Sequence, residues 1–324
     1  YTEPTPPLLA DRGEFRPVIG EGAIALQAHD PGSRVLFRRV RIRPLAGELA
    51  ASGSAPAESD ELAQHLIDLA AHNVPVVDYH VHLKEGLTME QALEKSRHDG
   101  IQYGIAVNCG ASFPVQDDAS ALEFLESLRG QPVFIAMQAE GREWTEMFSQ
   151  RAAAKFDYIF TDSMTWTDNR GRRMRLWIPE EVGEIADAEE FMDTLVDRAV
   201  GIFDDEPVDI YVNPTYLPAV LAGDYDRLWT EERMQRVIDA ARANDVAIEI
   251  NDRYKLPSKA FLELAKAAGC KFSFGTNNSG PDDLGRSAYG VEMALALELG
   301  WKDFFVPGAW VPKAAERKGG ALRG

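Results

Sequence analysis

From residue 74 onward the chain alternates short apolar runs with longer stretches in which apolar residues recur at helical spacing. Short apolar runs bounded by turn-forming residues predict buried β-strands, and a period of about 3.6 predicts amphipathic helices. We expect strands within 75–83, 103–110, 132–141, 157–164, 208–215, 246–253 and 271–278. The helices expected between them are 88–98, 119–128, 188–203, 231–243, 258–268 and 287–299.

This regular alternation predicts an α/β fold with parallel strands, because parallel neighbours need a crossover connection that is usually a helix. We expect residues 74–324 to form a distorted, TIM-like (β/α)7 barrel. An open, doubly wound sheet is the alternative, and the short apolar run 304–306 is a candidate eighth strand.

A different pattern precedes the barrel. Within residues 1–46, the runs AIALQAHD and RVLFRRVRIRPL are separated by PGS, which predicts a short β segment folded as a hairpin, with a bulge between Phe37 and Val40. Residues 47–73 predict a small, polar linker and then a helix that begins near Ser59. His65 and His72 lie on this helix, where we expect structural or surface roles.

The first predicted barrel strand ends in the sequence DYHVHL, which carries His80 and His82. Residues two apart on a strand point to the same face, so both imidazoles and Asp78 are expected to converge at the strand's carboxyl end. Neutral imidazole is the commonest metal-binding side chain in proteins. The alternative is a pair of strand-end histidines held by hydrogen bonds.

Polar residues stand at the carboxyl end of every predicted barrel strand. They are His80, His82, Asn108, Cys109, Glu140, Asp162, Ser163, Asn213, Asn251, Asp252, Asn277 and Asn278. Active sites of (β/α) barrels lie at this end of the strands, although Asn and Asp also favour the turns that follow strands. The sequence therefore predicts a polar site at this face.

Four of these residues are predicted metal ligands: His80, His82, Glu140 and Asp162. Two nitrogen and two oxygen ligands suit one divalent ion such as Zn, Mn or Fe. A bound metal would lower the pKa of its water and polarise a substrate oxygen. A shift of one residue in the fourth strand would turn Asp162 away and bring Ser163 inward.

Glu249, Asp252 and Lys84 are the predicted catalytic side chains. Glu249 lies two residues before Asn251, deeper on the same face, where a carboxylate serves as a base, as a metal ligand, as the partner of a ligand, or as a purely structural group. Lys84, Arg253 and Lys255 are placed to bind an anionic or hydroxyl-rich ligand. The predicted substrate-binding residues are Asn213, Asn251, Arg253, Asn277, Asn278 and Trp166.

The segment 169–177, NRGRRMRLW, is basic and lies between Trp166 and Trp177 in the loop after the fourth strand. Arginines with tryptophans could form a lid over a sugar or an acid. The alternative for most of the arginines is pairing with Glu180, Glu181 and Glu184.

The formal net charge is −18, from 34 basic and 52 acidic residues, with a pI near 4.8. Such a surface repels nucleic acid. No apolar run approaches the roughly 18 residues that span a bilayer, so no membrane span is expected. The partner that remains is a small-molecule substrate. Two cysteines, Cys109 and Cys270, do not fix the compartment, and no disulfide is expected between them.

The region from about 75 to 310 resembles the PHP (polymerase and histidinol phosphatase) superfamily. The resemblance is carried by DYHVHL, by the segment around Glu140, and by EIND followed by KFSFGTNN. It implies a distorted seven-stranded barrel with metal-dependent phosphoesterase or related hydrolase activity. The chain departs from the family pattern at Asp162 and Asn213, where histidines are usual, and at Asn277 and Asn278, where Asp and His close the motif. The resemblance therefore implies one metal ion or none.

The sequence EGAIALQAHDPGSRVLFRRVRIRPL resembles the final strands of the 3-keto-disaccharide hydrolase domain family, a jelly-roll of the concanavalin type. Only the end of such a domain is present, so residues 1–46 are interpreted as its hairpin remnant. This resemblance implies carbohydrate catabolism. It also implies an exported, periplasmic or secreted bacterial protein, with a cytoplasmic location left open.

Together these observations predict a metal-dependent hydrolase acting on a sugar-derived or carboxylated small molecule, with metal-bound water as nucleophile and Glu249 or Asp252 as base. One alternative is a keto-sugar lyase or isomerase, in which the metal stabilises an enolate and a carboxylate or Lys84 moves the proton. The other is a non-catalytic, sugar-binding barrel with a degenerate metal site, in which Trp166, Trp177 and Trp310 stack against glycans.

Overall fold

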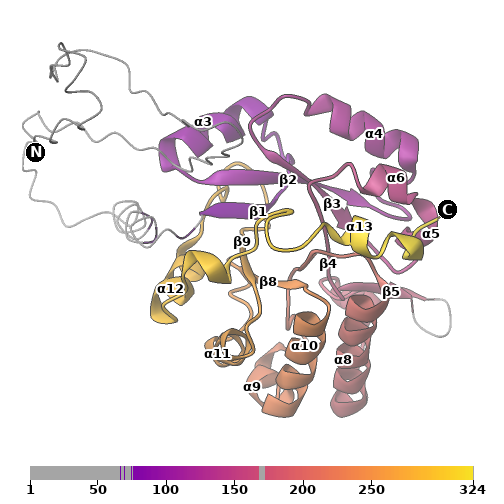
Figure 1. Ribbon diagram of the computed structural model, residues 1–324. Coiled ribbons are helices and arrows are strands. Elements are labelled where there is room, and N and C mark those ends of the chain that lie inside the picture. The colour runs from indigo at the N-terminus through magenta and orange to yellow at the C-terminus, as the bar shows by residue number, and fades with distance from the viewer. Residues whose placement is uncertain (1–65, 67–68, 70–73, 75, 168–171, 324) are drawn as a thin grey trace, which may run out of the picture. The chain divides into compact units, whose positions relative to one another are not determined.

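The computed structural model describes residues 66, 69, 74, 76–167 and 172–323 (Figure 1). The hairpin predicted over 1–46 lies outside these residues. So do the linker and almost all of the helix predicted over 47–73, of which only Leu66 and Leu69 are described as helical and buried.

Seven parallel strands close into a barrel in the order β1-β2-β3-β4-β7-β8-β9, with β1 paired to β9 (Figure 1). The strands are β1 (Val77–Val81), β2 (Gln102–Cys109), β3 (Phe134–Ala139), β4 (Tyr158–Thr161), β7 (Ile210–Tyr211), β8 (Ala247–Asn251) and β9 (Phe272–Gly275). The predicted (β/α)7 barrel is therefore confirmed. Each strand falls inside the segment predicted for it, apart from Gln102 at the start of β2.

Helices connect these strands on the outside of the barrel (Figure 1). The long ones are α3 (Met89–Asp99), α4 (Asp118–Ser127), α8 (Ala188–Asp205), α10 (Glu231–Ala243), α11 (Lys259–Ala267) and α12 (Ala288–Ala296). All six were expected from the apolar spacing. Five begin after a residue whose side chain accepts a backbone N–H, which satisfies a donor that the first turn leaves free: Thr88, Asp117, Asp187, Thr230 and Ser258.

Shorter helices lie in the connections: α5 (Trp144–Met147), α6 (Gln150–Ala153), α7 (Pro179–Val182), α9 (Tyr225–Leu228) and α13 (Ala314–Arg317). The connection after β4 also contains an antiparallel hairpin of β5 (Thr165–Thr167) and β6 (Arg173–Arg175), which the sequence did not predict. The run 304–306 adds no eighth strand, because Phe304 makes only a single parallel bridge to Phe272 and the 3-10 helix Trp301–Asp303 precedes it.

Apolar side chains fill the barrel interior below its polar end. This interior cluster consists of Val77, Tyr79, Ala106, Ala136, Tyr158, Phe160, Ile210, Val212, Ala247 and Phe305. A second, larger cluster packs the outer faces of the strands against the helices. Both cysteines are free and buried, as expected. Among the described residues, no helix combines the length and the hydropathy that a membrane crossing requires.

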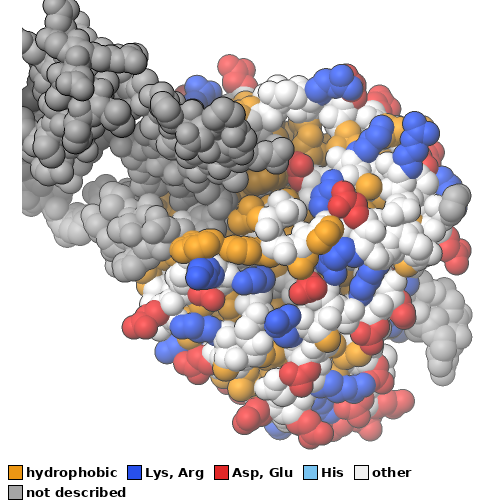
Figure 2. Space-filling view, viewed as in Figure 1, with side chains coloured by type: hydrophobic (Ala, Val, Ile, Leu, Met, Phe, Trp, Pro, Cys, Tyr) orange, Lys and Arg blue, Asp and Glu red, His pale blue; other side chains and the backbone are white. Residues whose placement is uncertain are grey.

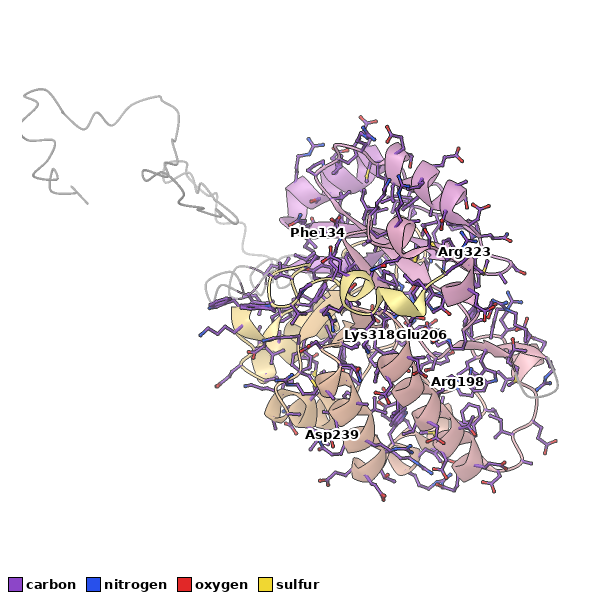
Figure 3. The ribbon with its side chains drawn as sticks, turned by 45° about the vertical axis from the view of Figure 1, so that its right-hand side comes forward. Phe134, Arg198, Glu206, Asp239, Lys318 and Arg323 are labelled. Atoms are coloured by element: carbon purple, nitrogen blue, oxygen red, sulfur yellow. The ribbon has the colours of Figure 1, made fainter. Side chains whose placement is uncertain are left out.

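The C-terminal segment closes the amino-terminal end of the barrel. Asp209 accepts hydrogen bonds from the amide of Ile159 at 2.9 Å and from the amide of Ala314 at 2.7 Å, which ties α13 to the start of β4 and β7. Lys318 reaches the carboxyl end of α8 and the side chain of Asn244 (Figure 3). Figure 2 shows this face, with Lys and Arg side chains near its centre and many Asp and Glu side chains along its lower edge.

Asp209 gives the fold a pH dependence that a substitution should remove. Burial raises the pKa of Asp209 to about 6, so the folded state holds a proton that the unfolded state has lost above about pH 4. The stability that this bound proton adds to the folded protein is complete below the pKa that Asp209 has in the unfolded state. It disappears as pH rises through the pKa that Asp209 has in the folded state. Relative to Asp209→Asn, the wild-type protein should lose about 2 kcal/mol of unfolding free energy between about pH 4.5 and about pH 7.

Chemical unfolding of both proteins across this pH range measures the difference directly. A difference that stays constant with pH, or one that grows in favour of the wild type as pH rises, would show that Asp209 does not titrate in this way.

Candidate functional site

His80 and Glu249 form a buried pair at the carboxyl end of the barrel. Nδ1 of His80 lies 2.6 Å from Oε1 of Glu249, and both side chains are about 1% exposed. The other ring nitrogen of His80, Nε2, is buried and has no hydrogen-bond partner among the described residues. A carboxylate that accepts a hydrogen bond from one ring nitrogen fixes the orientation and tautomer of the imidazole. The second nitrogen can then accept a proton or bind a ligand.

Two local features let this pair form. The pairing of β1 with β2 shifts register between Asp78 and Val81, and both Tyr79 and His80 contact aromatic rings of the interior cluster. This irregularity turns the histidine inward. On β9, Gly275 lies against the pair: a Cβ there would stand 1.9 Å from Oε1 of Glu249. Only glycine leaves room for the carboxylate.

The predicted convergence of Asp78 with the histidines is not what the structure contains. Its carboxylate accepts hydrogen bonds from the amides of His80 at 3.1 Å and Thr276 at 3.0 Å, and from the Thr276 hydroxyl. Asp78 therefore joins β1 to the end of β9, because the register shift places it on the opposite side of the strand from the His80 ring.

The second oxygen of Glu249 is held by the loop after β7 and by β8. It accepts hydrogen bonds from the amide of Asn213 at 2.6 Å and from Nδ2 of Asn251 at 2.9 Å. Asn213 has a φ of 47°, in the left-handed region that Asn tolerates better than most residues. The strained backbone points its amide at the carboxylate.

A chain of side-chain amides extends from this carboxylate across the mouth of the barrel. Oδ1 of Asn213 accepts from Asn251 at 3.1 Å and from Asn277 at 3.2 Å. Its Nδ2 donates to Asp162 at 2.8 Å. The structure thus brings Asn213, Asn251 and Asn277 together, and Asp162 faces the same network. Their predicted role in binding a substrate stays a prediction.

Glu140 occupies the other side of the mouth. Its carboxylate accepts hydrogen bonds from Asn108 at 2.8 Å, Gln138 at 3.0 Å and Thr165 at 3.1 Å. Burial, followed by the nearby charge of Asp162, raises the pKa of Glu140 to about 8. Burial also raises the pKa of Asp162. Both buried carboxyl groups therefore keep a proton to a higher pH than an exposed carboxyl group does.

His82 stands beside His80, with the ring centroids 5.3 Å apart. Burial, together with the charges of His80 and Lys84, lowers the pKa of His82 well below its usual value, so its ring is neutral. Asn278 clamps the backbone here: it accepts from the His82 amide at 2.8 Å and donates to the His82 carbonyl at 3.0 Å. Asn278 therefore holds the strand end, and its amide is used by the backbone instead of by a ligand.

The donor chemistry of His80, His82, Glu140 and Asp162 suits a divalent metal, but their arrangement does not form one compact centre. Among the described residues there is no group of three or more His, Cys, Asp or Glu side chains positioned to hold a metal ion. The bound Zn, Mn or Fe ion stays a prediction, and we derive no chemical step through it.

Two predicted site residues have other contacts in the structure. The ring of Trp166 is buried, packs against Phe191 of α8 at 5.6 Å, and is covered by the guanidinium of Arg198 at 4.0 Å (Figure 3). Because β5 packs on α8, its face is not available to a substrate. Asp252 accepts hydrogen bonds from the amides of Tyr289 at 2.7 Å and Gly290 at 3.2 Å, so it caps α12.

Two arginines of the predicted basic segment pair with acidic residues. This agrees with the alternative given for these arginines and not with a lid over a substrate. Arg175 donates from Nε to both carboxylate oxygens of Glu181, at 3.0 Å each, and Arg173 contacts Glu143 at 2.9 Å. Trp177 is partly exposed. Residues 168–171 of this loop lie outside the described residues.

Arg142 was missed by the sequence analysis, although it follows directly after Glu140 and Gly141. Its guanidinium donates to Glu206 at 2.8 Å, to the Thr161 hydroxyl at 2.9 Å and to the Asp162 carbonyl at 3.2 Å. Glu206, at the end of α8 (Figure 3), also accepts from Trp144 at 2.6 Å. A single Arg beside a predicted site residue was the only available signal, because its partners are distant in sequence.

We expect Arg142→Met to destabilise the protein by about 3 kcal/mol, because it leaves the Glu206 carboxylate buried with one neutral donor. Adding Glu206→Gln should restore part of this loss, since the buried charge is then removed. Thermal or urea unfolding of the two variants measures both effects.

Arg227→Met, which removes an exposed arginine from ion pairs with Glu189 and Asp224, is the matched control and should change stability little. Equal losses in the buried and exposed variants would contradict the argument.

Comparison with known proteins finds distant structural likenesses that carry no argument about this chain. No protein-family model and no curated protein matches the chain. Among solved structures, a deoxyribose phosphate aldolase from Aeropyrum pernix is 11% identical with a TM-score of 0.37, over 81% of this chain and 97% of that chain. A chain of archaeal ribonuclease P with mature tRNA is 13% identical with a TM-score of 0.33, over 73% and 98%. Neither likeness bears on function.

Proposed function

We propose that this chain is a hydrolase that acts on a sugar-derived or carboxylated small molecule at the carboxyl end of the barrel. The observation that supports it most strongly is the state of His80. One ring nitrogen is fixed on Glu249, and the other is buried with no partner among the described residues. A buried polar atom of this kind normally has a partner, and water or a substrate hydroxyl is the chemistry that fits.

In this proposal His80 is the general base. When Nδ1–H donates its hydrogen bond to Glu249, the ring has a lone pair on Nε2, which takes a proton from water as the water oxygen bonds to the electrophilic carbon. The bond to the leaving oxygen breaks, and that oxygen receives a proton from Glu140, whose pKa of about 8 keeps it protonated near neutral pH. The side-chain network of Asn213, Asn251 and Asn277 holds the Glu249 carboxylate on one side and the Asp162 carboxylate on the other.

The metal-dependent form of the same hydrolysis is the second candidate. The observations that favour it are the neutral ring of His82 and the two neighbouring buried carboxyl groups, which a cation would stabilise. For this candidate, His80, His82, Glu140 and Asp162 would have to lie closer together than they do in this structure to hold the single divalent ion, which would supply an acidic water when bound.

The test is a screen of methyl esters, lactones and methyl glycosides of sugar acids with protein purified without added metal, in parallel with elemental analysis. The proposal expects hydrolysis of at least one class and no near-stoichiometric Zn, Mn or Fe. Hydrolysis that appears only with such a metal would favour the second candidate. Products formed by elimination or isomerisation would overturn both, and so would the absence of any product.

A further inference from the structure

A pocket of about 440 Å³ lies between the loops that follow β7 and β8, at the same end of the barrel as His80. Its lining is Tyr216, Leu217, Ala219, Ala222, Tyr225, Asp226, Tyr254, Lys255, Leu256 and Ser258. This volume matches that of small-molecule sites, which are typically about 300–1,000 Å³ and mostly apolar with a few polar groups. We refer to it as the tyrosine pocket.

Two aromatic rings form one wall of the tyrosine pocket. Tyr216 and Tyr254 pack edge to face with ring centroids 4.9 Å apart, and both side chains are half-buried. Partly exposed tyrosine rings offer an apolar face together with a hydroxyl. A six-membered ring with an apolar face, such as a pyranose or an arene, fits such a wall.

One cation stands beside this wall without a carboxylate partner. The guanidinium of Arg253 lies 5.6 Å from the centre of the Tyr254 ring and donates to the Asn277 carbonyl at 3.1 Å. Within the described part of the chain, Arg253 has no carboxylate within 4.0 Å of its charged nitrogens. In a protein of net charge −18, such an unpaired arginine at the barrel mouth suits an anionic ligand. The guanidinium of Arg253 presents the parallel N–H donors that a carboxylate binds in a bidentate way.

The tyrosine pocket is connected to the His80–Glu249 pair by a single residue. Asn251 donates to Glu249 at 2.9 Å through its Nδ2, and its Oδ1 accepts from the amide of Tyr254 at 2.9 Å. Asn213, which also binds Glu249, lies three residues before Tyr216. A ligand in this pocket therefore lies next to the residues that hold the proposed base.

We propose that the tyrosine pocket binds the ring of a carboxylated six-membered ring compound, and that Arg253 binds its carboxylate. This inference rests on the proposed hydrolase function for the role of the ligand as substrate. Two sources share this chemistry: a sugar acid, whose pyranose stacks on the tyrosines, and an aromatic acid.

Calorimetric titration with three probes tests the inference: D-glucuronate, benzoate, and D-glucose as the uncharged match of glucuronate. At least one acid should bind, and D-glucose should bind at least about tenfold more weakly than that acid. Stronger binding of D-glucuronate would identify the sugar-acid source, and stronger binding of benzoate the aromatic one.

Variants of the same protein identify where the acid binds. Arg253→Gln should weaken binding of the acid by about tenfold or more, because the partner of its carboxylate is lost. Tyr216→Leu should also weaken binding, because the ring of the ligand loses its aromatic contact. Arg236→Gln removes an arginine of similar exposure on α10 and should leave binding unchanged. Failure of both acids to bind, equal binding of D-glucose, or full affinity in Arg253→Gln would overturn the inference.

Binding and turnover separate this inference from the proposed function. Acid binding that needs Arg253 in a protein that hydrolyses nothing would leave the pocket assigned and refute the hydrolase. Hydrolysis of uncharged sugar derivatives that needs His80 but is unaffected by Arg253→Gln would refute the pocket assignment and leave the hydrolase.

Discussion

Replacing His80 by asparagine is expected to lower kcat/KM for hydrolysis by about 10³-fold or more, because it removes the proposed base, whose ring is buried. Asn cannot accept a proton from water at neutral pH. Initial rates on whichever ester, lactone or glycoside the wild type hydrolyses give this ratio.

The substitution also leaves Glu249 with one partner fewer, so a folded variant has to be demonstrated by circular dichroism and thermal unfolding. His98→Asn is the matched control, since His98 lies at the exposed end of α3, where its ring pairs with Asp99. Its activity should equal that of the wild type. A folded His80→Asn protein that retains wild-type kcat/KM would remove His80 from the mechanism.

Gly275→Ala is expected to destabilise the protein by about 3 kcal/mol or more and to abolish activity. The new Cβ would stand 1.9 Å from Oε1 of Glu249 and 2.9 Å from Cβ of His80, closer than non-bonded atoms approach. Relief requires either β9 to shift or Glu249 to leave His80, and each breaks buried hydrogen bonds.

Gly201→Ala is the matched control for this change. Gly201 lies inside α8, and a Cβ there would meet no atom within 4 Å, so the substitution should stabilise the helix by about 0.5–1 kcal/mol. Guanidinium unfolding of the two variants gives both values. Equal stability of Gly275→Ala and the wild type would show that the strand and Glu249 adapt without loss, and the tight fit inferred here would be wrong.

The sequence predicted the barrel well because its signals are local. Each strand is a short apolar run, and each helix has an apolar face and in most cases a capping residue that can be identified within a dozen positions. The gathering of Asn213, Asn251 and Asn277 was also predictable, since parallel strands end at the same face.

The pairings inside the site were not predictable in the same way. His80 and Glu249 are 169 positions apart, and their contact depends on the register shift in β1 and on the space left by Gly275. A residue two positions from a neighbour shares its face only while the strand stays regular. β1 is not regular at Asp78, whose carboxylate accepts a hydrogen bond from the Thr276 amide instead of facing the histidines.

Side chains with several possible partners account for the remaining differences. Trp166 was expected over a substrate, but Arg198 and Phe191 of α8 cover its ring, since the β5–β6 hairpin packs there. Asp252 was expected at the mouth, but free amides at the start of α12 bind its carboxylate. The pattern of residue types along the sequence does not indicate which of several possible partners lies nearest to such a side chain in the folded protein.

The most direct test of the central claim is oxygen transfer from H₂¹⁸O into the product by protein that has been stripped of divalent metal with a chelator. The account predicts one labelled oxygen for each bond that the wild type hydrolyses, located in the product that contains the attacked carbon, and no product from a folded His80→Asn variant. Unlabelled product, or labelled product that forms only after Zn, Mn or Fe is restored, would contradict hydrolysis driven by the His80–Glu249 pair.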